Sequence, residues 1–317
     1  MKLDGIHHVT AISADAQSAI DFHVGVLGLR LVKTTVNFDA PDLYHLYLGD
    51  ETGSPGSILT FFEVRGAPAG RPGAGMIHRI VWRVPSRESL DFWADRLGGA
   101  GRPVERSDDA LISSDPEGLG IEMVVPADAD GAPRAAWSPD IPAGHALGGI
   151  AGVRAYSASA GDTGRLLTDG LGFTRDDDGR LVAAGAQRRG VYVVDPAPAE
   201  PPVQGAGTVH HVAWTAPDAE HAGWISRIRA AGGRPTGVID RQYFLSIYFH
   251  EPGGVLFEIA SPSPGFAVDE EPGHLGEALR LPPQYERHRD RIEERLTPLD
   301  NPRTRLAPPV ATSQESR

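Results

Sequence analysis

The fold is decided by a short pattern near the N-terminus, GIHHV at residues 5–9, which recurs three times in altered form. The later copies are MIHRI at 76–80, GIAGV at 149–153 and TVHHV at 208–212. Each copy opens a strand-like run, and most are followed by a polar break, a helical pattern and further strand-like runs. The sequence therefore predicts one βαβββ unit written four times.

The repeat divides the chain into four modules and a tail. We predict modules at residues 1–66, 75–126, 148–195 and 207–261, separated by Gly/Pro-rich linkers, with a capping helix and tail at 262–317. The helical pattern of the tail covers residues 281–296, and residues beyond 298 are expected to be mobile. One unit alone leaves a face of its sheet bare, so two must pack together. The predicted fold is α+β, with four βαβββ modules forming two paired-sheet cups.

Two positions can be compared across the modules: the fourth residue of the first strand, and an acid near the end of the last strand. The first module supplies His8 but has Thr60 or Phe61 at the acidic position, whereas the fourth supplies both His211 and Glu258. Side chains alternate between the two faces of a strand, so only one histidine of each His-His doublet is expected to face a cup directly. Modules 1 and 4 together therefore offer two imidazoles and one carboxylate.

The other two modules offer no comparable set of metal ligands. The second has Arg79 and Glu122 at these positions, and the third has Gly152 and no acid. We interpret Glu122 as a strand-end acid that pairs with Arg79. The sequence thus predicts that modules 1 and 4 carry a metal site and that modules 2 and 3 form a cup without one.

Two histidines and one carboxylate form the facial triad of non-haem Fe(II) oxygenases, which leaves coordination positions open for an organic substrate and dioxygen. A lone histidine in a strand is more often a hydrogen-bonded core residue than a ligand, and a lone glutamate at a strand end is usually solvated. The equivalent repeat positions of His8 and His211, with Glu258 in register, favour the metal. Mn(II) is compatible with the same donors.

Composition excludes several classes of function. Hydrophobic residues make up 40% of the chain and charged residues 23%, which is typical of a globular protein. The net charge of −12 argues against a nucleic-acid partner. No apolar run approaches the roughly 18 residues of a membrane span, and the lack of cysteine excludes disulfides and thiolate metal sites. A strand-like pattern begins at once and leaves no room for a signal peptide, so a cytoplasmic protein is the simplest interpretation.

A set of short motifs follows in fixed order from about residue 4 to residue 297. The stretches are Gly5–Thr10, Thr35–Asp39, Tyr44–Leu46, Gly49–Gly53, Pro55–Gly56, Phe61–Phe62, Val209–Trp214, Asp240–Arg241, Tyr243–Phe244, Ser246–Phe249, Pro252–Ala260, Leu281–Pro283, His288–Arg289 and Ile292–Glu293. Any one of them is weak, but the ordered set is specific. In these stretches the chain resembles the vicinal oxygen chelate superfamily, and within it the ring-cleaving dioxygenases of the hydroquinone type.

The resemblance implies site residues beyond the repeat argument. It places iron on the same three ligands, and it implies catalytic or substrate-side roles for His7, His210, Arg241 and Tyr248. A cation or phenol near the open positions stabilises charge on an oxygen, and a histidine beside the ring serves as acid or base. The chain departs from the family at Leu245 and His250, where basic residues are expected, and at Glu63-Val64, where a proline-containing turn is usual. These departures bear on substrate choice more than on the reaction.

The predicted function is Fe(II)-dependent, extradiol-type cleavage of a hydroquinone or related aromatic diol by dioxygen. One alternative is a glyoxalase-like isomerase or lyase, which favours a second acidic ligand that the first module does not supply. Another is a metal-free protein that binds an aromatic ligand and has no need for two histidines and a glutamate in register. The sequence leaves open the ring substituents, the choice of Fe(II) or Mn(II), the pathway, and the oligomeric state, with a homodimer among the options.

Overall fold

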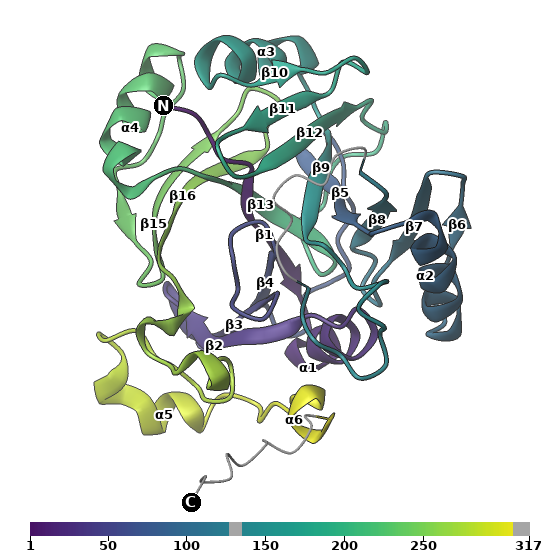
Figure 1. The fold of residues 1–317 in the computed structure, drawn as a ribbon. Helices are drawn as coiled ribbons and strands as arrows, with labels where there is room; N and C mark the ends of the chain where they lie inside the picture. The colour runs from purple at the N-terminus through teal and green to yellow at the C-terminus, as the bar shows by residue number, and fades with distance from the viewer. Residues whose placement is uncertain (127–134, 307–317) are drawn as a thin grey trace, which may run out of the picture.

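Each sheet of the computed structural model, which describes residues 1–126 and 135–306, combines four strands from the first half of the chain with four from the second. Within these residues, sixteen strands form two mixed sheets of eight (Figure 1). The elements follow one another as strand, helix and three strands, four times along the chain. Part of the linker predicted between the second and third modules lies outside the described residues, as does the end of the tail.

The first sheet is built from the two ends of the chain, as predicted. Its central strands β1 (Ile6–Ser13) and β13 (Thr208–Thr215) are antiparallel neighbours. Each has a parallel partner on its other side, β4 (Ile58–Glu63) and β16 (Leu256–Pro264) respectively. The sheet is completed on the β4 side by β3 (Ala40–Gly49) and β2 (Arg30–Asn37), and on the β16 side by β15 (Phe244–His250) and β14 (Ile239–Asp240). It curls into half of a barrel (Figure 1).

The second sheet repeats this arrangement with the middle of the chain. Strands β5 (Met76–Arg83) and β9 (Ile150–Tyr156) are its antiparallel centre, with β8 (Gly120–Val124) and β12 (Arg189–Asp195) as their parallel partners. The outer strands are β7 (Ala110–Ser114), β6 (Glu105–Arg106), β11 (Leu181–Ala184) and β10 (Thr174–Arg175). Because both sheets share one order, positions can be compared between them by register.

In each repeat, a helix follows the first strand and connects it to the second. The first of these helices is α1 (Ala16–Ile20), which continues as the π-helix η1 (Asp21–Val26). Asp15 caps α1 by accepting the backbone N–H groups of Gln17 and Ser18. The others are α2 (Arg87–Gly99), α3 (Ala160–Arg165) with the π-helix η2 (Leu166–Gly170), and α4 (His221–Ala230) preceded by η3 (Asp218–Glu220). No helix of the described residues is long and apolar enough to cross a bilayer.

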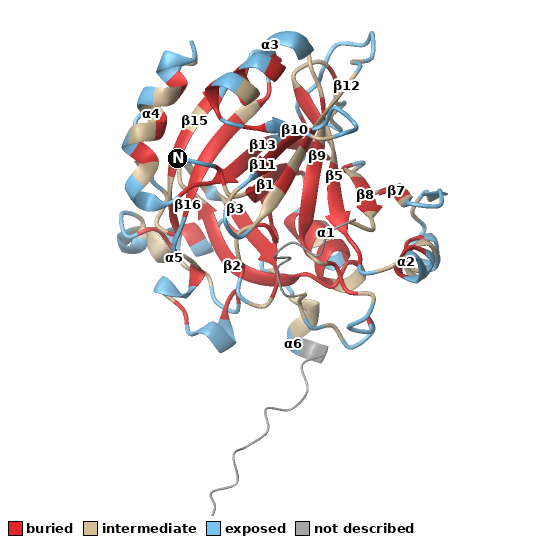
Figure 2. Ribbon diagram, turned by 45° about the horizontal axis from the view of Figure 1, so that its top comes forward, coloured by how far each residue is buried: buried red, intermediate tan, exposed pale blue. Residues whose placement is uncertain are grey.

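Large aromatic side chains fill the space between the sheets and helices. The indole of Trp214 on β13 is fully buried, with its ring centroid 4.9 Å from Phe173 and 6.4 Å from Tyr192 in the second sheet's half. Truncating a buried ring of this size costs about 3–5 kcal/mol. Figure 2 shows the result, with buried central strands and helices exposed on their outer faces.

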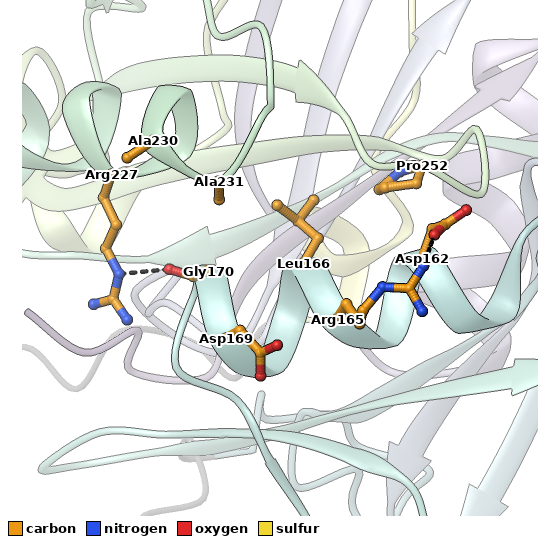
Figure 3. A pocket seen from close by; sticks show the side chains of 9 residues that line it. All are labelled: Asp162, Arg165, Leu166, Asp169, Gly170, Arg227, Ala230, Ala231 and Pro252. Atoms are coloured by element: carbon orange, nitrogen blue, oxygen red, sulfur yellow. Dashed lines mark hydrogen bonds and ion pairs between the residues drawn. The ribbon is translucent and has the colours of Figure 1, made fainter.

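Two helices on one side of the molecule are joined directly. Arg227 Nε on α4 donates a hydrogen bond of 2.5 Å to the carbonyl of Gly170 at the end of η2 (Figure 3). A shallow surface hollow of about 610 Å³ lies between them, with Leu166 and Ala231 among its walls. The two histidines and the glutamate predicted to bind metal are not among its lining residues.

The C-terminal segment packs on the first sheet as short turns rather than one long helix. Its elements are η4 (Phe266–Val268), η5 (Pro272–His274), η6 (Glu286–His288), α5 (Arg289–Glu293) and α6 (Pro302–Leu306). The pattern over residues 281–296 is therefore helical only in part, because adjacent prolines at 282 and 283 lack the N–H groups that extend a helix. Residues 307–317, for which mobility was predicted, lie outside the described residues.

Candidate metal centre

Three buried side chains from three central strands converge on one face of the first sheet. His8 Nε2 on β1 lies 3.2 Å from His211 Nε2 on β13. Glu258 Oε2 on β16 lies 3.2 Å from the first of these nitrogens and 2.9 Å from the second. Their exposed fractions are 2%, 4% and 0%. The structure thus brings together the three residues that the repeat singled out, with all candidate ligand atoms within 4.8 Å of one another.

A second histidine fixes the proton on each of these imidazoles. His7 Nε2 lies 3.0 Å from the carbonyl of Ser261, which can only accept, so that nitrogen carries the hydrogen. Burial lowers the pKa of His7 well below its ordinary value, so the ring is neutral and its Nδ1 is an acceptor. That Nδ1 lies 2.9 Å from His8 Nδ1, which must therefore donate. The lone pair of His8 is left on Nε2, facing Glu258.

The fourth module repeats this arrangement. His210 Nδ1 lies 2.8 Å from His211 Nδ1, and the Thr10 hydroxyl lies 3.0 Å from His211 Nε2, where it can donate to a bare nitrogen. Burial lowers the pKa of His211, which favours the neutral ring.

The donor set fits a divalent cation. Two bare imidazole nitrogens and one carboxylate oxygen point at a common centre, and such acceptors repel one another unless a cation lies between them. Within the described part of the chain, no hydrogen bond reaches Glu258 Oε2, whereas Oε1 accepts one of 2.5 Å from Ser246. Two imidazoles and a carboxylate suit Fe, Mn or Zn. The structure therefore supports a divalent metal without identifying it.

β-Bulges place the outer histidine of each doublet beside its neighbour. In the β1–β13 ladder, residues 6 and 8 oppose residues 214 and 213, so His7 is the extra residue. Further along the same ladder, residues 10 and 11 oppose residues 211 and 209, so His210 is extra. The second sheet has bulges at the same repeat position, at His78 and Ala151. A bulge re-aims a side chain without breaking the strand, which here lets both rings of a doublet meet through Nδ1.

The first module has a hydroxyl where the fourth has its acid. Thr10 pairs with Thr60 on β4 as Ala213 pairs with Glu258 on β16, and each first-named residue stands two positions after a ligand histidine. Thr60 Oγ1 lies 2.9 Å from Thr10 Oγ1 and 3.0 Å from His45 Nε2. A second carboxylate ligand, which the isomerase alternative favours, is therefore absent from this position.

A cavity of about 40 Å³ opens beside the ligand atoms. Arg241 and Tyr248 line it, with Arg241 Nε 3.3 Å from the phenol oxygen. Apolar walls come from Phe38, Phe62 and Phe244. Of the four residues to which the resemblance gives substrate-side or catalytic roles, these two face the cavity. His7 and His210 are not among its lining residues and lie behind the ligands.

Sequence reasoning missed His45 and Tyr47. Both line the cavity, and the Tyr47 hydroxyl lies 3.1 Å from His45 Nδ1, which extends the hydrogen-bond chain from Thr60. Burial lowers the pKa of His45 well below its ordinary value. The available signal was their i, i+2 spacing on β3, which puts both side chains on one face. This spacing indicates the site only once the pairing register of β3 with its neighbouring strands is known.

The equivalent positions of the second sheet hold no metal ligands in a converging set. Arg79 occupies the place of His8, and its Nη1 lies 3.1 Å from Glu122 Oε2, which is the pairing predicted from the sequence. Gly152 occupies the place of His211. Among the described residues, the group formed by His8, His211 and Glu258 is the candidate metal site.

Comparison with known proteins places this geometry in context. The chain is 41% identical over 307 residues to "Putative ring-cleaving dioxygenase MhqE" of Bacillus subtilis, a match that covers 94% of this chain and 100% of that protein. It is 33% identical over 309 residues to the chlorohydroquinone/hydroquinone 1,2-dioxygenase of Sphingobium indicum, covering 92% and 95% respectively.

A solved structure and a family model agree with these relatives. The crystal structure of a "putative dioxygenase from Bacillus subtilis" superposes with a TM-score of 0.87 at 40% identity and covers 95% of this chain and 98% of that one. The model of the Glyoxalase/Bleomycin resistance protein/Dioxygenase superfamily matches residues 5–123 and 154–259. On its sequence, its fold and its buried His-His-Glu group, this chain belongs to that superfamily.

Proposed function

We propose that this protein is an Fe(II)-dependent ring-cleaving dioxygenase that opens a hydroquinone or a related aromatic diol with dioxygen. The observation that carries the proposal is the open three-ligand set of His8, His211 and Glu258, with Thr60 in place of a fourth ligand. The relative named as a hydroquinone 1,2-dioxygenase supports the substrate class. We choose Fe(II) over Mn(II) because of this resemblance.

When bound, the metal would bring the diol and dioxygen together and pass electrons between them. The protein supplies the environment for this chemistry. Phe38, Phe62 and Phe244 form an apolar surround for an aromatic ring. Arg241 places a guanidinium at the cavity, where a positive charge stabilises a developing oxyanion. Burial raises the pKa of Tyr248, so its phenol keeps its proton and can donate a hydrogen bond.

The proposed roles of His7 and His210 differ from direct acid–base catalysis. Each lies behind a ligand histidine and accepts its Nδ1–H, so each is a positioning residue that aims a lone pair at the metal. We also propose that each strand–helix–strand–strand–strand run is a module with the boundaries expected from the sequence. In this view modules 1 and 4 share the metal cup.

The proposal is tested by oxygen uptake. Protein loaded anaerobically with Fe(II) is offered hydroquinone, chlorinated and methylated hydroquinones, and catechols. We expect uptake with one of these classes, together with a ring-opened absorbing product. Replacement of His8, His211 or Glu258 by Ala abolishes turnover, while the circular dichroism spectrum stays that of the parent.

Other results would redirect the assignment. Bound metal in stoichiometric amount without oxygen uptake would favour an isomerase or lyase. Failure to bind metal at all would favour a metal-free aromatic-binding protein. Full activity in any one of the three Ala variants would refute the ligand set.

A further inference from the structure

The cavity beside the metal centre has a second polar side, which has no role in the function proposed above. Tyr248 on β15 lines one side of the cavity together with Arg241. His45 and Tyr47 on β3 line the cavity as well. In the order of the sheet, β15 and β3 flank the four central strands from opposite ends. An aromatic diol in this cavity therefore has polar partners on two sides.

In the repeat, His45 takes the place of a serine that contacts a metal ligand. His45 on β3 and Ser246 on β15 correspond, because each pairs with the residue two positions after the ligand position of the next strand. Ser246 donates a hydrogen bond of 2.5 Å to Glu258 Oε1. His45 Nε2 lies 3.0 Å from Oγ1 of Thr60, which holds the ligand position in the first module. Unlike a hydroxyl, the imidazole has a second nitrogen, and Tyr47 is its partner.

The hydrogen bonds determine which nitrogen of His45 carries the proton. Thr60 Oγ1 donates its single hydrogen to Thr10 Oγ1 at 2.9 Å, so towards His45 it can only accept, from Nε2–H. Burial lowers the pKa of His45 well below its ordinary value, so the ring is neutral and Nδ1 is bare. The Tyr47 hydroxyl, 3.1 Å away, therefore donates to Nδ1. Its oxygen keeps lone pairs that can accept a hydrogen from a molecule in the cavity.

The surroundings of both side chains suit the transfer of a proton between them. His45 is 7% exposed and Tyr47 1%, so bulk water competes little for their hydrogen bonds. Burial raises the pKa of Tyr47 well above its ordinary value, so its hydroxyl can pass a proton on without remaining ionised. Besides burial, the carboxylate of Glu258 favours a positive charge on His45 and the guanidinium of Arg241 opposes it. His45 therefore holds no extra proton at rest, as a base requires.

We propose that Tyr47 and His45 form a relay that takes the proton from one hydroxyl of an aromatic diol in the cavity. The diol hydroxyl donates to the Tyr47 oxygen, and the hydrogen of the Tyr47 hydroxyl passes to His45 Nδ1. The diol becomes a phenolate, Tyr47 is neutral again, and His45 is an imidazolium whose Nε2–H stays on Thr60. For its substrate the relay rests on the proposed function. Tyr47 touches the diol, and His45 acts through Tyr47.

Ionisation of the bound diol tests the relay without oxygen. Hydroquinone and catechol are added anaerobically to the Fe(II)-loaded full-length chain, and near-ultraviolet difference absorbance distinguishes phenol from phenolate at each pH. Tyr47→Phe keeps the ring and removes the hydroxyl. We expect the bound diol to ionise at least one pH unit higher in this variant than in the parent. When oxygen is admitted, kcat is expected to fall about 100-fold and KM to change much less.

His45→Gln separates a base from a hydrogen-bond partner. Its amide can donate to Thr60 and accept from Tyr47 but cannot hold the extra proton, so the bound diol is again expected to ionise at higher pH. Tyr44→Phe on the same strand is the matched control. The hydroxyl of Tyr44 donates to the backbone carbonyl of Thr297 at 2.9 Å, and its loss leaves ionisation and turnover unchanged. Chelator competition and circular dichroism are expected to show parent-like metal affinity and folding in all three variants.

The relay is overturned if the diol ionises at the parent pH in folded Tyr47→Phe or His45→Gln. It is also overturned if the loaded parent binds neither diol, or binds one only as the neutral phenol. Ionised binding that is shifted in both variants supports the relay even where no oxygen is consumed. That last result would refute ring cleavage alone, so the relay and the proposed function fail separately.

Discussion

At the scale of single residues, the two doublets share one hydrogen-bond pattern but differ in exposure. His7 is 2% exposed, and its Nε2 is tied to the Ser261 carbonyl. His210 is exposed and lines a separate cavity of about 280 Å³ together with His250. If His210 is replaced, water can therefore accept the Nδ1–H of His211. Water cannot do the same for His8, because the position of His7 is buried. We expect the two positions to differ in their tolerance of substitution.

His7 can be tested through metal affinity rather than turnover. His7→Phe removes the acceptor for His8 Nδ1–H and is expected to weaken divalent-metal binding about 10–100-fold. His7→Gln restores most of the affinity, because its amide can accept from His8 and donate to Ser261. His78→Phe, at the equivalent bulge of the second sheet, is the matched control and leaves metal affinity unchanged. Chelator competition measures all three, and parent-like affinity in His7→Phe would contradict the positioning role.

At the scale of elements, β2 is fixed to the C-terminal segment by a buried lysine. Lys33 is fully buried, and its Nζ contacts the carboxylates of Asp269 and Glu270. These partners lie 236 and 237 residues away along the chain. Glu270 is itself buried, with 1% of its side chain exposed. Loss of the lysine would remove the closer of two cationic neighbours of that charge, the other being Arg280, whose Nε lies 3.7 Å from Glu270 Oε1.

Lys33→Met is expected to lower the free energy of unfolding by about 3–5 kcal/mol, because it breaks a buried ion pair from one side. The double variant Lys33→Met/Glu270→Leu removes both charges and should recover most of that loss. Lys2→Met, at an exposed lysine, is the control and changes little. Urea unfolding followed by circular dichroism gives the comparison. A double variant no more stable than Lys33→Met would argue that the lysine acts through packing alone.

The whole molecule shows what the sequence could predict. The fourfold repeat made equivalent positions comparable, so the pairing of the chain ends and the convergence of His8, His211 and Glu258 could be inferred without a structure. The β-bulges could not, because an inserted strand residue has no side-chain signature. Strand alternation predicted one inward histidine per doublet and gave no hint that His7 would bond to His8. Lys33 and its partners depend on a contact across most of the chain.

Turns of each sheet contact helices of the modules that form the other sheet. Glu251 in the β15–β16 turn accepts a hydrogen bond of 2.5 Å from Thr163 on α3. In the β7–β8 turn, Asp115 Oδ2 lies 4.0 Å from Nε2 of His23 on η1. These acids correspond in the repeat, as the sequences at 115–122 and 251–258 indicate. Each contact joins neighbouring modules that belong to different sheets.

His23 and Asp115 affect stability in opposite directions as the pH falls. Burial lowers the pKa of His23 from 6.5 to about 4, so between these values the unfolded chain binds a proton that the folded chain does not. Acidification then destabilises the fold by about 3 kcal/mol through this group. Burial raises the pKa of Asp115 from 3.8 to about 6, so in that window the folded chain holds a proton that the unfolded chain has released. Acidification stabilises the fold through this group by a similar amount.

The opposing contributions can be separated with two isosteric variants. Asp115→Asn keeps an acceptor for the backbone N–H groups of Glu117 and Leu119 but no longer titrates. Relative to the parent, its free energy of unfolding should fall by about 3 kcal/mol between pH 7 and pH 4, because the loss at His23 is no longer offset. His23→Gln should rise relative to the parent over the same range. Urea unfolding at several pH values measures both differences, in which the contributions of all other groups cancel. Profiles parallel to the parent in both variants would mean that neither group changes its pKa on folding.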